Sequence, residues 1–221
     1  MKRYDLVVFD WDGTLMDTTD AIAEGIAKAF DALGYSHPGT EKIKRIIGLD
    51  WKSAVKTLVT GFRDSDMPAF EAEYRKWYLK KEKTIGLFPG TVELLHSLKK
   101  SGTKLAIATG KSRAGLRRVF RQTGIESLFD ATVTADESEP KPAPDMLIKI
   151  AGLTGTPLSR AVMVGDTTHD TDMACCAGCG AIAVTYGAFP REAFAGSSAV
   201  ICDSIEELRS ELGVKSPDSK H

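Results

Sequence analysis

Two aspartates near the start of the chain have the type and the spacing that a chemical site requires. Residues 7–15 read Val-Val-Phe-Asp-Trp-Asp-Gly-Thr-Leu, a short apolar strand pattern that ends in Asp10 and Asp12 before a Gly-Thr turn. Alternation along an extended segment points both carboxylates the same way, beyond the carboxyl end of the strand. Such crowding is costly unless a cation binds or one carboxyl group carries a proton. The pair indicates a catalytic or metal site, and a strand followed by an acidic turn is the structural alternative.

Further polar residues follow later segments that have the pattern of buried strands. With the strand before Asp10 counted as the first, Thr109 follows the second strand segment and Lys141 follows the third by a loop. Asp166 and Asp170 follow the fourth. Taken singly, Thr109 could simply end a strand and Lys141 could be a solvated loop lysine. Because ligands of parallel α/β sheets bind at the carboxyl ends of the strands, their common place favours one shared site.

The elements that would position these residues alternate between strand and helix. Apolar strand patterns occur at 104–108, 131–134, 161–165, 181–184 and 199–201. Helical patterns occur at 92–100, 112–122, 145–152, 170–177 and 205–212. This alternation predicts an α/β fold, in which a doubly wound, mainly parallel, Rossmann-like sheet carries helices on both faces.

The stretch after the first strand has a different pattern. Ile22, Ile26 and Phe30 recur every four positions, and residues 40–83 keep helical spacing without a convincing strand. We therefore expect an inserted α-helical cap domain. The expected division is a Rossmann-like catalytic core at 1–17 and 86–214, a cap at 18–85 and a flexible tail at 215–221.

Two groups of side chains are explained better by packing than by ligand binding. The aromatic residues Tyr74, Trp77 and Tyr78 are expected in the core of the cap. The cysteines lack a second paired set of metal ligands, so we expect small buried thiols at a helix end and no zinc site. The four cysteines are Cys175, Cys176, Cys179 and Cys202.

The overall composition is ordinary for a soluble globular protein. The chain has 221 residues, of which 43% are hydrophobic and 27% charged, and its formal net charge is −1. Near-neutral charge argues against a nucleic-acid partner bound through a broad basic face. No apolar run approaches the roughly 20 residues needed to cross a bilayer, and the N-terminus lacks the core of a signal peptide. We therefore expect no membrane partner and a cytoplasmic location.

The four motifs together resemble the haloacid dehalogenase-like hydrolase superfamily. They are Asp10-Trp11-Asp12-Gly13-Thr14, Thr109-Gly110, Lys141 in Pro-Lys-Pro-Ala-Pro-Asp, and Gly165-Asp166-x-x-x-Asp170. The helical insert after the first motif is similar to the small α-helical cap of the subfamily that contains phosphoglycolate phosphatases and β-phosphoglucomutases. Residues 87–90 and 141–147 look most like the phosphoglycolate-phosphatase-like hydrolases. The resemblance implies an enzyme, a phosphatase that hydrolyses a small phosphate monoester.

The resemblance also implies distinct roles for the first two acids. Asp10 is the nucleophile, which attacks phosphorus and forms an aspartyl-phosphate. Asp12 is the general acid that protonates the departing oxygen, and then the base that takes a proton from the hydrolytic water. Asp12 must therefore be protonated when the substrate arrives, while Asp10 must be ionised.

A Mg²⁺ cofactor follows from the same resemblance, because several ionised aspartates would repel a phosphate dianion unless a cation intervened. The implied metal ligands are the Asp10 carboxylate, the Asp12 backbone carbonyl, the Asp166 carboxylate and, directly or through water, Asp170. Lys141 would neutralise the attacking and transferring groups as a further catalytic residue. The implied phosphate-binding residues are Gly13, Thr14, Thr109, Gly110 and Lys141.

The residues that select the substrate are expected in the cap. Arg45 and Lys52 are candidates for binding a substrate carboxylate or second phosphate, although both could lie on a solvated helix face. Lys111 and Arg113 are weaker candidates beside the Thr109 motif. The expected partner is a small phosphorylated metabolite: phosphoglycolate, a sugar phosphate, a nucleoside monophosphate or pyrophosphate.

Other functions remain open on the same residues. One is a phosphosugar mutase of the β-phosphoglucomutase type, and others are an inorganic pyrophosphatase and a nucleotidase. A non-hydrolytic phospho-switch similar to a response-regulator receiver is disfavoured, because it would need a phosphoacceptor aspartate after a strand in the middle of the chain. The sequence is compatible with a monomer and with a homodimer.

Overall fold

The computed structural model describes residues 3–49 and 51–214, and for residues 51–53 it describes the backbone alone. The predicted tail at 215–221 therefore lies outside the described residues. No helix in the described ranges is long and apolar enough to span a membrane.

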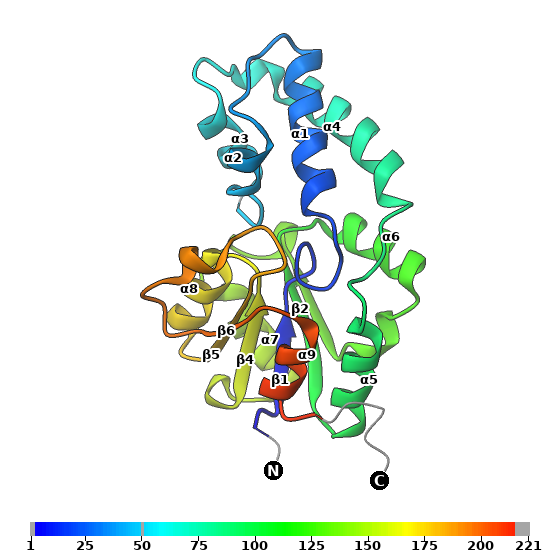
Figure 1. The fold of residues 1–221 in the computed structure, drawn as a ribbon, viewed down its shortest axis with the longest axis vertical. Coiled ribbons are helices and arrows are strands. Elements are labelled where there is room, and N and C mark those ends of the chain that lie inside the picture. Colours follow the sequence, from blue (N-terminus) through cyan, green and yellow to red (C-terminus); the bar gives the residue numbers. More distant parts are fainter. Residues whose placement is uncertain (1–2, 50, 215–221) are drawn as a thin grey trace.

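A six-stranded parallel sheet forms the lower part of the molecule (Figure 1). Its strands are β1 (Leu6–Phe9), β2 (Lys104–Thr109), β3 (Ala131–Thr134), β4 (Ala161–Gly165), β5 (Gly180–Val184) and β6 (Val200–Cys202). Their order is β3-β2-β1-β4-β5-β6, so the chain starts in the centre, builds one side and then returns to build the other. The order reverses between β1 and β4, and sheets of this kind bind ligands in the crevice at such a point.

Helices cover both faces of the sheet. They are α5 (Thr91–Lys100), α6 (Arg113–Thr123), α7 (Asp145–Thr154), α8 (Thr168–Ala177) and α9 (Ile205–Glu211). The alternation of β1 divides its residues between two cores. Val7 and Phe9 pack in a cluster with residues of α5, α6 and α9, and Leu6 and Val8 pack in a cluster with residues of α7 and α8. The predicted α/β, Rossmann-like architecture is confirmed.

Four helices form a separate unit above the carboxyl ends of the strands (Figure 1). They are α1 (Thr19–Ala32), α2 (Thr40–Lys44), α3 (Trp51–Leu58) and α4 (Met67–Glu82). This helical unit has its own hydrophobic cluster, in which Ile26, Phe30 and Phe70 are almost fully buried. The described residues between α1 and α4 contain no strand. The division into two domains at the predicted boundaries stays a prediction.

Two connecting segments join the helical unit to the sheet, and they run side by side. The Asp17 amide donates to the Gly86 carbonyl at 3.2 Å, and the Phe88 amide donates to the Leu15 carbonyl at 3.0 Å. Short 3-10 helices complete the chain. They are Asp64–Asp66, Glu126–Leu128, Ala135–Glu137, Leu158–Arg160 and Arg191–Phe194.

The start of α8 differs from the predicted 170–177. The helix begins two residues earlier because Thr167 and Asp170 form a capping box. The Thr167 side chain accepts from the Asp170 backbone, and the Asp170 carboxylate accepts from the Thr167 amide. This places Asp170 inside the first turn of the helix.

The prediction of buried cysteines is wrong for three of the four. Cys175 and Cys176 are exposed, Cys179 is partly exposed, and Cys202 is buried. The reason is helical periodicity, because Met173 and Ala174 occupy the face of α8 that packs on the sheet. The prediction of an aromatic core in the helical unit is also only partly right. Tyr78 is buried, Tyr74 is half-buried and Trp77 is 36% exposed.

We predict a clear difference in thiol reactivity. In the native protein a thiol reagent should modify Cys175 and Cys176 quickly. Cys202 should react only after denaturation, because burial raises the pKa of its thiol to about 11, with smaller contributions from nearby acids, and the thiolate is the reactive form. Absorbance of the released chromophore measures both phases. A Cys175→Ser/Cys176→Ser variant should lose the fast phase, while Cys202→Ser should keep it; a fast phase lost in Cys202→Ser would contradict the structure.

Candidate active site

The end of β1 delivers Asp10 to the crevice between β1 and β4. Its amide donates to the Val164 carbonyl at 2.9 Å, so the pairing with β4 continues one residue past the strand. The chain then turns tightly, with the Gly13 amide bonded to the Met16 carbonyl at 2.9 Å. Gly13 has a φ of +76°, and a Cβ atom there would lie 2.1 Å from Asp166 Oδ2. Only glycine allows the turn to approach Asp166 this closely.

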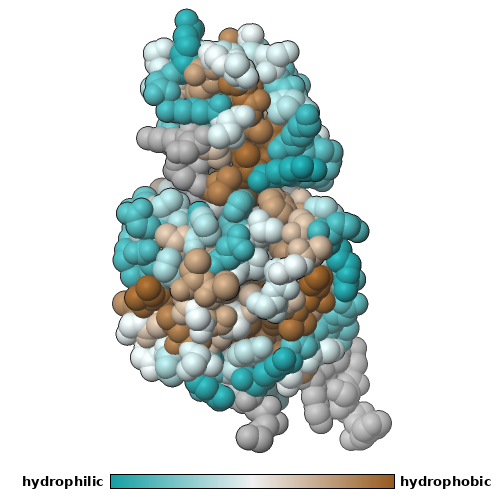
Figure 2. All heavy atoms as spheres, turned by 90° about the vertical axis from the view of Figure 1, so that its left-hand side faces the viewer, coloured by the Kyte–Doolittle hydropathy of each residue, from teal (hydrophilic) through white to brown (hydrophobic). Residues whose placement is uncertain are grey.

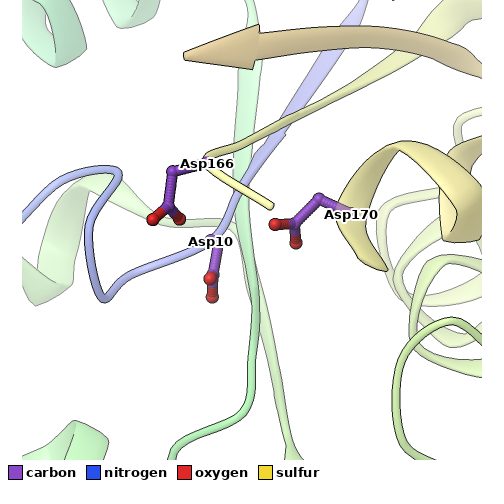
Figure 3. A group of neighbouring side chains, drawn as sticks. All are labelled: Asp10, Asp166 and Asp170. Carbon is purple, nitrogen blue, oxygen red and sulfur yellow. The ribbon is translucent and has the colours of Figure 1, made fainter. Parts of the chain in front are cut away.

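Three aspartates converge at this edge of the sheet (Figure 3). Asp10 and Asp166 come from the ends of β1 and β4, and Asp170 comes from the first turn of α8. One carboxylate oxygen from each lies within 4.8 Å of the other two. All three residues are almost completely buried. This geometry is consistent with the prediction that the three aspartates belong to one site.

Each carboxylate in this cluster is held by protein groups. Asp166 accepts from the Thr14 hydroxyl at 3.0 Å and from the Ala188 amide at 2.7 Å. The Lys141 ammonium lies 3.0 Å from Asp10 Oδ1 and 2.6 Å from Asp170 Oδ1. Lys141 is 2% exposed and precedes a cis peptide bond to Pro142. It is a buried cation, and the alternative of a solvated loop lysine is excluded.

The cluster holds more acidic groups than one ammonium can neutralise. Burial, together with Asp170 and Asp12, raises the pKa of Asp10 to about 7 in spite of Lys141. Burial and the neighbouring Asp10 and Asp170 raise the pKa of Asp166 well above its ordinary value. Burial opposes the charge of Lys141, but Asp10 and Asp170 outweigh it and raise the pKa of the ammonium. The site therefore favours an additional positive charge.

The residues present fit a divalent metal ion. Their donor atoms are carboxylate oxygens, which hard divalent cations prefer, and they lie close enough together to share one ion. A bound cation would favour the ionised carboxylates and offset the cost of burying them. Asp170 is the least open to a metal, because its Oδ1 binds the Lys141 ammonium and its Oδ2 binds Thr167. Both oxygens of Asp166 also accept hydrogen bonds, but their donors, Thr14 and Ala188, are neutral.

Asp12 stands apart from the three clustered acids and faces the helical unit. Its Oδ1 accepts from the Thr18 hydroxyl at 2.7 Å and lies 2.8 Å from the Lys111 ammonium. Thr109, at the end of β2, is fully buried, and its hydroxyl oxygen accepts from the Lys111 amide at 3.2 Å. The hydroxyl proton of Thr109 is thus left to donate elsewhere.

A cavity of about 600 Å³ lies between the helical unit and the end of the sheet that carries Asp10 and Asp12. Its lining includes Asp10, Asp12, Gly110 and Lys111 from the sheet side. The helical unit contributes mainly apolar and aromatic side chains, namely Ile22, Ile26, Ile46, Ile47, Leu49, Tyr74, Tyr78 and Leu79. Figure 2 shows a band of hydrophobic surface that runs down the helical unit to its junction with the sheet. Tyr74 and Tyr78, which were expected in the cap core, therefore face a ligand-sized space.

Not every predicted residue reaches this cavity. Arg45 is exposed and does not line it, so it matches the alternative of a solvated helix face. The side chain of Lys52 lies outside the described residues. Arg113 pairs with Glu137 and binds Thr132, away from the acids. Of the candidates whose side chains the structure describes, only Lys111 contacts one of the predicted catalytic acids, Asp12.

Sequence reasoning missed several groups that shape the site. Thr18 is the N-cap residue of α1, but its hydroxyl donates to the Asp12 carboxylate and does not cap the helix. Thr14 was expected to donate to phosphate, and here its hydroxyl donates to Asp166. The Ala188 amide carries no sequence signal at all, since every residue except proline offers the same donor.

The comparison with known proteins decides the family. The family of haloacid dehalogenase-like hydrolases matches this chain over residues 7–184, which include every acid described above. The chain belongs to this family.

The names of three similar proteins all refer to enzymes that transfer or hydrolyse phosphoryl groups. A probable phosphatase, IndB, of Dickeya dadantii is 35% identical over 92% of this chain and 91% of its own. The phosphoglycolate phosphatase of Salmonella typhi is 30% identical over 97% of this chain and 94% of its own. A tyrosine-protein kinase, PtkA, of Mycobacterium tuberculosis is 32% identical over 95% of this chain and 72% of its own.

A solved structure shares the fold of this haloacid dehalogenase-like chain. A hydrolase from Pseudomonas syringae superposes with a TM-score of 0.85 at 23% identity, over 93% of this chain and 96% of its own. With the family and the named relatives, the chain is a hydrolase that acts on phosphate esters, similar to phosphoglycolate phosphatases.

We predict that Gly13→Ala lowers activity by about 10²-fold while the protein stays folded, because the new methyl group would displace Asp166. Gly34→Ala is a matched control. Gly34 has a similar φ of +75°, but nothing lies within 4 Å of its added Cβ. It should lose about 1 kcal/mol of stability and keep its activity. Equal activities of the two variants, measured with a phosphate-release assay, would contradict the site geometry.

We also predict that the metal-free protein, kept in a chelator, becomes less stable as pH rises from about 4 to 7. A pKa of about 7 for Asp10 in the folded state exceeds its ordinary value of 3.8, so between these values the folded state holds more protons and stability falls with pH. The effect should be on the order of a few kcal/mol. Asp10→Asn should flatten this slope in thermal unfolding measured with a chelator. An equally steep slope in Asp10→Asn would contradict the raised pKa.

Proposed function

We propose that the protein is a Mg²⁺-dependent phosphatase that hydrolyses a small phosphate monoester through an aspartyl-phosphate on Asp10. The observation that carries the proposal is the convergence of Asp10, Asp166, Asp170 and Lys141 at the end of a cavity that Asp12 also lines. This convergence supports the proposal, because Asp10 would act as the nucleophile, Asp12 as the proton donor and Lys141 as a cation beside them.

In the proposed reaction a carboxylate oxygen of Asp10 attacks phosphorus, and the bond from phosphorus to the departing oxygen breaks. Asp12 gives its proton to that oxygen, so that an alcohol leaves. In the second half, Asp12 takes a proton from water, and the water oxygen displaces Asp10 from phosphorus. The products are inorganic phosphate, the regenerated Asp10 carboxylate and Asp12 with its proton restored.

Groups around Asp10 would bind the transferring phosphoryl oxygens. The Thr109 hydroxyl proton is free to donate to one of them, and the Gly110 amide follows at the edge of the cavity. Lys141 lies 3.0 Å from Asp10 and adds positive charge beside the reacting atoms. Gly13 and Thr14 complete the turn that surrounds the phosphate.

Mg²⁺ is the metal that suits this donor set, because it prefers oxygen ligands and keeps waters and substrate oxygens in its coordination shell. Asp10, Asp166 and the Asp12 carbonyl would hold it. When bound, it polarises the phosphoryl group and offsets the repulsion between the carboxylates and the phosphate dianion. Asp170 would act through Lys141 and Thr167, whose groups engage both of its oxygens.

The proposed substrate is a small phosphorylated metabolite. A cavity of about 600 Å³ is of the size that binds small molecules. The likeness to phosphoglycolate phosphatases makes phosphoglycolate the first ester to test, together with sugar phosphates, nucleoside monophosphates and pyrophosphate.

The test is a panel of phosphate esters assayed for free phosphate with Mg²⁺ and with a chelator. We expect turnover that requires the metal, no activity in Asp10→Asn, and a loss of about 10²–10⁴-fold in Asp12→Asn on alkyl phosphates. Asp172→Asn is the matched control, since Asp172 is an exposed acid on α8, and it should keep full activity.

Other outcomes would contradict the proposal. Full activity of Asp10→Asn, with deamidation excluded by mass spectrometry, would remove the nucleophile. An isomerised sugar phosphate without free phosphate would indicate a mutase. A phosphoenzyme that persists without releasing phosphate would indicate a phospho-switch, and phosphate passed from a nucleotide to a tyrosine side chain would indicate a kinase.

A further inference from the structure

Lys111 joins the sheet side of the cavity to the helical unit. Its ammonium lies 2.8 Å from Asp12 Oδ1 and 2.9 Å from the Tyr78 hydroxyl oxygen on α4. The Lys111 side chain is 8% exposed, so these contacts are almost shielded from water. Within the described ranges, no other cation contacts Asp12.

The contacts of Asp12 distinguish its two oxygens. Lys111 and the Thr18 hydroxyl both bind Oδ1. No group in the described part of the chain is bonded to Oδ2, and Asp12 lines the cavity. Two donors on one oxygen fix the rotation of the carboxyl group, so Oδ2 is the oxygen left to exchange a proton with a substrate.

Lys111 is not explained by a need to neutralise Glu82, the other acid near it. Glu82 is 1% exposed and lies 3.9 Å from Lys111, but Arg118 of α6 already binds both of its carboxylate oxygens. The short contacts of Lys111 are to Asp12 and Tyr78. Burial opposes the charge of Lys111, yet Asp12, Tyr74 and Glu82 outweigh it and raise the pKa of the ammonium. It therefore stays a cation with Asp12 as its nearest acid.

We propose that Lys111 is a positioning residue for Asp12, holding Oδ1 together with Thr18 so that Oδ2 faces the leaving group, and that Tyr78 of the helical unit holds Lys111 in place. The inference rests on the proposed phosphatase reaction. When the bond from phosphorus to the leaving oxygen breaks, the proton on Oδ2 moves to that oxygen. The charge left on Asp12 then lies beside the Lys111 ammonium.

Phosphate esters with different leaving groups separate this role from a general loss of structure. An alkyl phosphate needs the proton from Asp12, whereas 2,4-dinitrophenyl phosphate releases a stable anion that needs none. The measured quantity is kcat/KM, which reports the steps up to formation of the phosphoenzyme. Single-turnover release of the nitrophenolate checks the same steps directly.

We expect Lys111→Met to lower kcat/KM for the alkyl ester by about 10²-fold and for the dinitrophenyl ester by no more than a few-fold. Thr18→Val and Tyr78→Phe should shift the ratio of the two values in the same direction by smaller amounts. Tyr78→Phe keeps the ring and its packing, so it preserves the test if Lys111→Met does not fold. Lys80→Met, an exposed lysine on the same α4 helix, should leave both values unchanged.

An equal loss on both esters, or no loss on either, would overturn the role of Lys111. Failure of the phosphatase proposal has a different signature, because the unmodified protein would then hydrolyse neither ester. If Lys111→Met behaves like the unmodified protein while Asp10→Asn is inactive, the phosphatase stands and the positioning role falls.

Discussion

The structure depends on an excess of negative charge buried at one point. Asp10, Asp166 and Asp170 meet within 4.8 Å of one another, and Lys141 is the only cation that the described residues place against them. Such a cluster costs free energy unless protons, hydrogen bonds or a further cation offset it. The hydrogen bonds from the turn after β1 and from Thr167 offset part of it. The negative charge that remains would attract a divalent cation, and the bound cation would then attract a phosphate group.

The order of the strands explains why the acids meet. β1 lies in the centre of the sheet with β4 beside it, so the residues that follow these two strands share one crevice. The helical unit closes the opposite side of the cavity, and α4 is linked to Asp12 through Tyr78 and Lys111. In the proposed reaction the reacting groups would therefore stand on the ends of strands, and the leaving group would occupy the cavity that the sheet shares with the helical unit.

Sequence reasoning succeeded where local pattern decides structure. The strand patterns and the rule for parallel sheets were enough to bring Asp10 and Asp166 together. Reasoning failed where the result depends on how distant elements pack. Lys111 was a weak candidate because its partner Tyr78 lies 33 residues away on another element. The exposure of Cys176 depends on which face of α8 meets the sheet, and that of Arg45 depends on which face of the helical unit meets the cavity.

Detection of a covalent phosphoenzyme tests the central claim most directly. The protein is mixed with substrate and Mg²⁺, quenched in acid within its first turnover, digested and analysed by mass spectrometry. The account predicts a phosphoryl group on Asp10, at a higher level in Asp12→Asn with 2,4-dinitrophenyl phosphate, because that ester still forms the intermediate while its hydrolysis lacks a base. Rapid turnover with no phosphorylated peptide, or with the phosphoryl group on another residue, would contradict it.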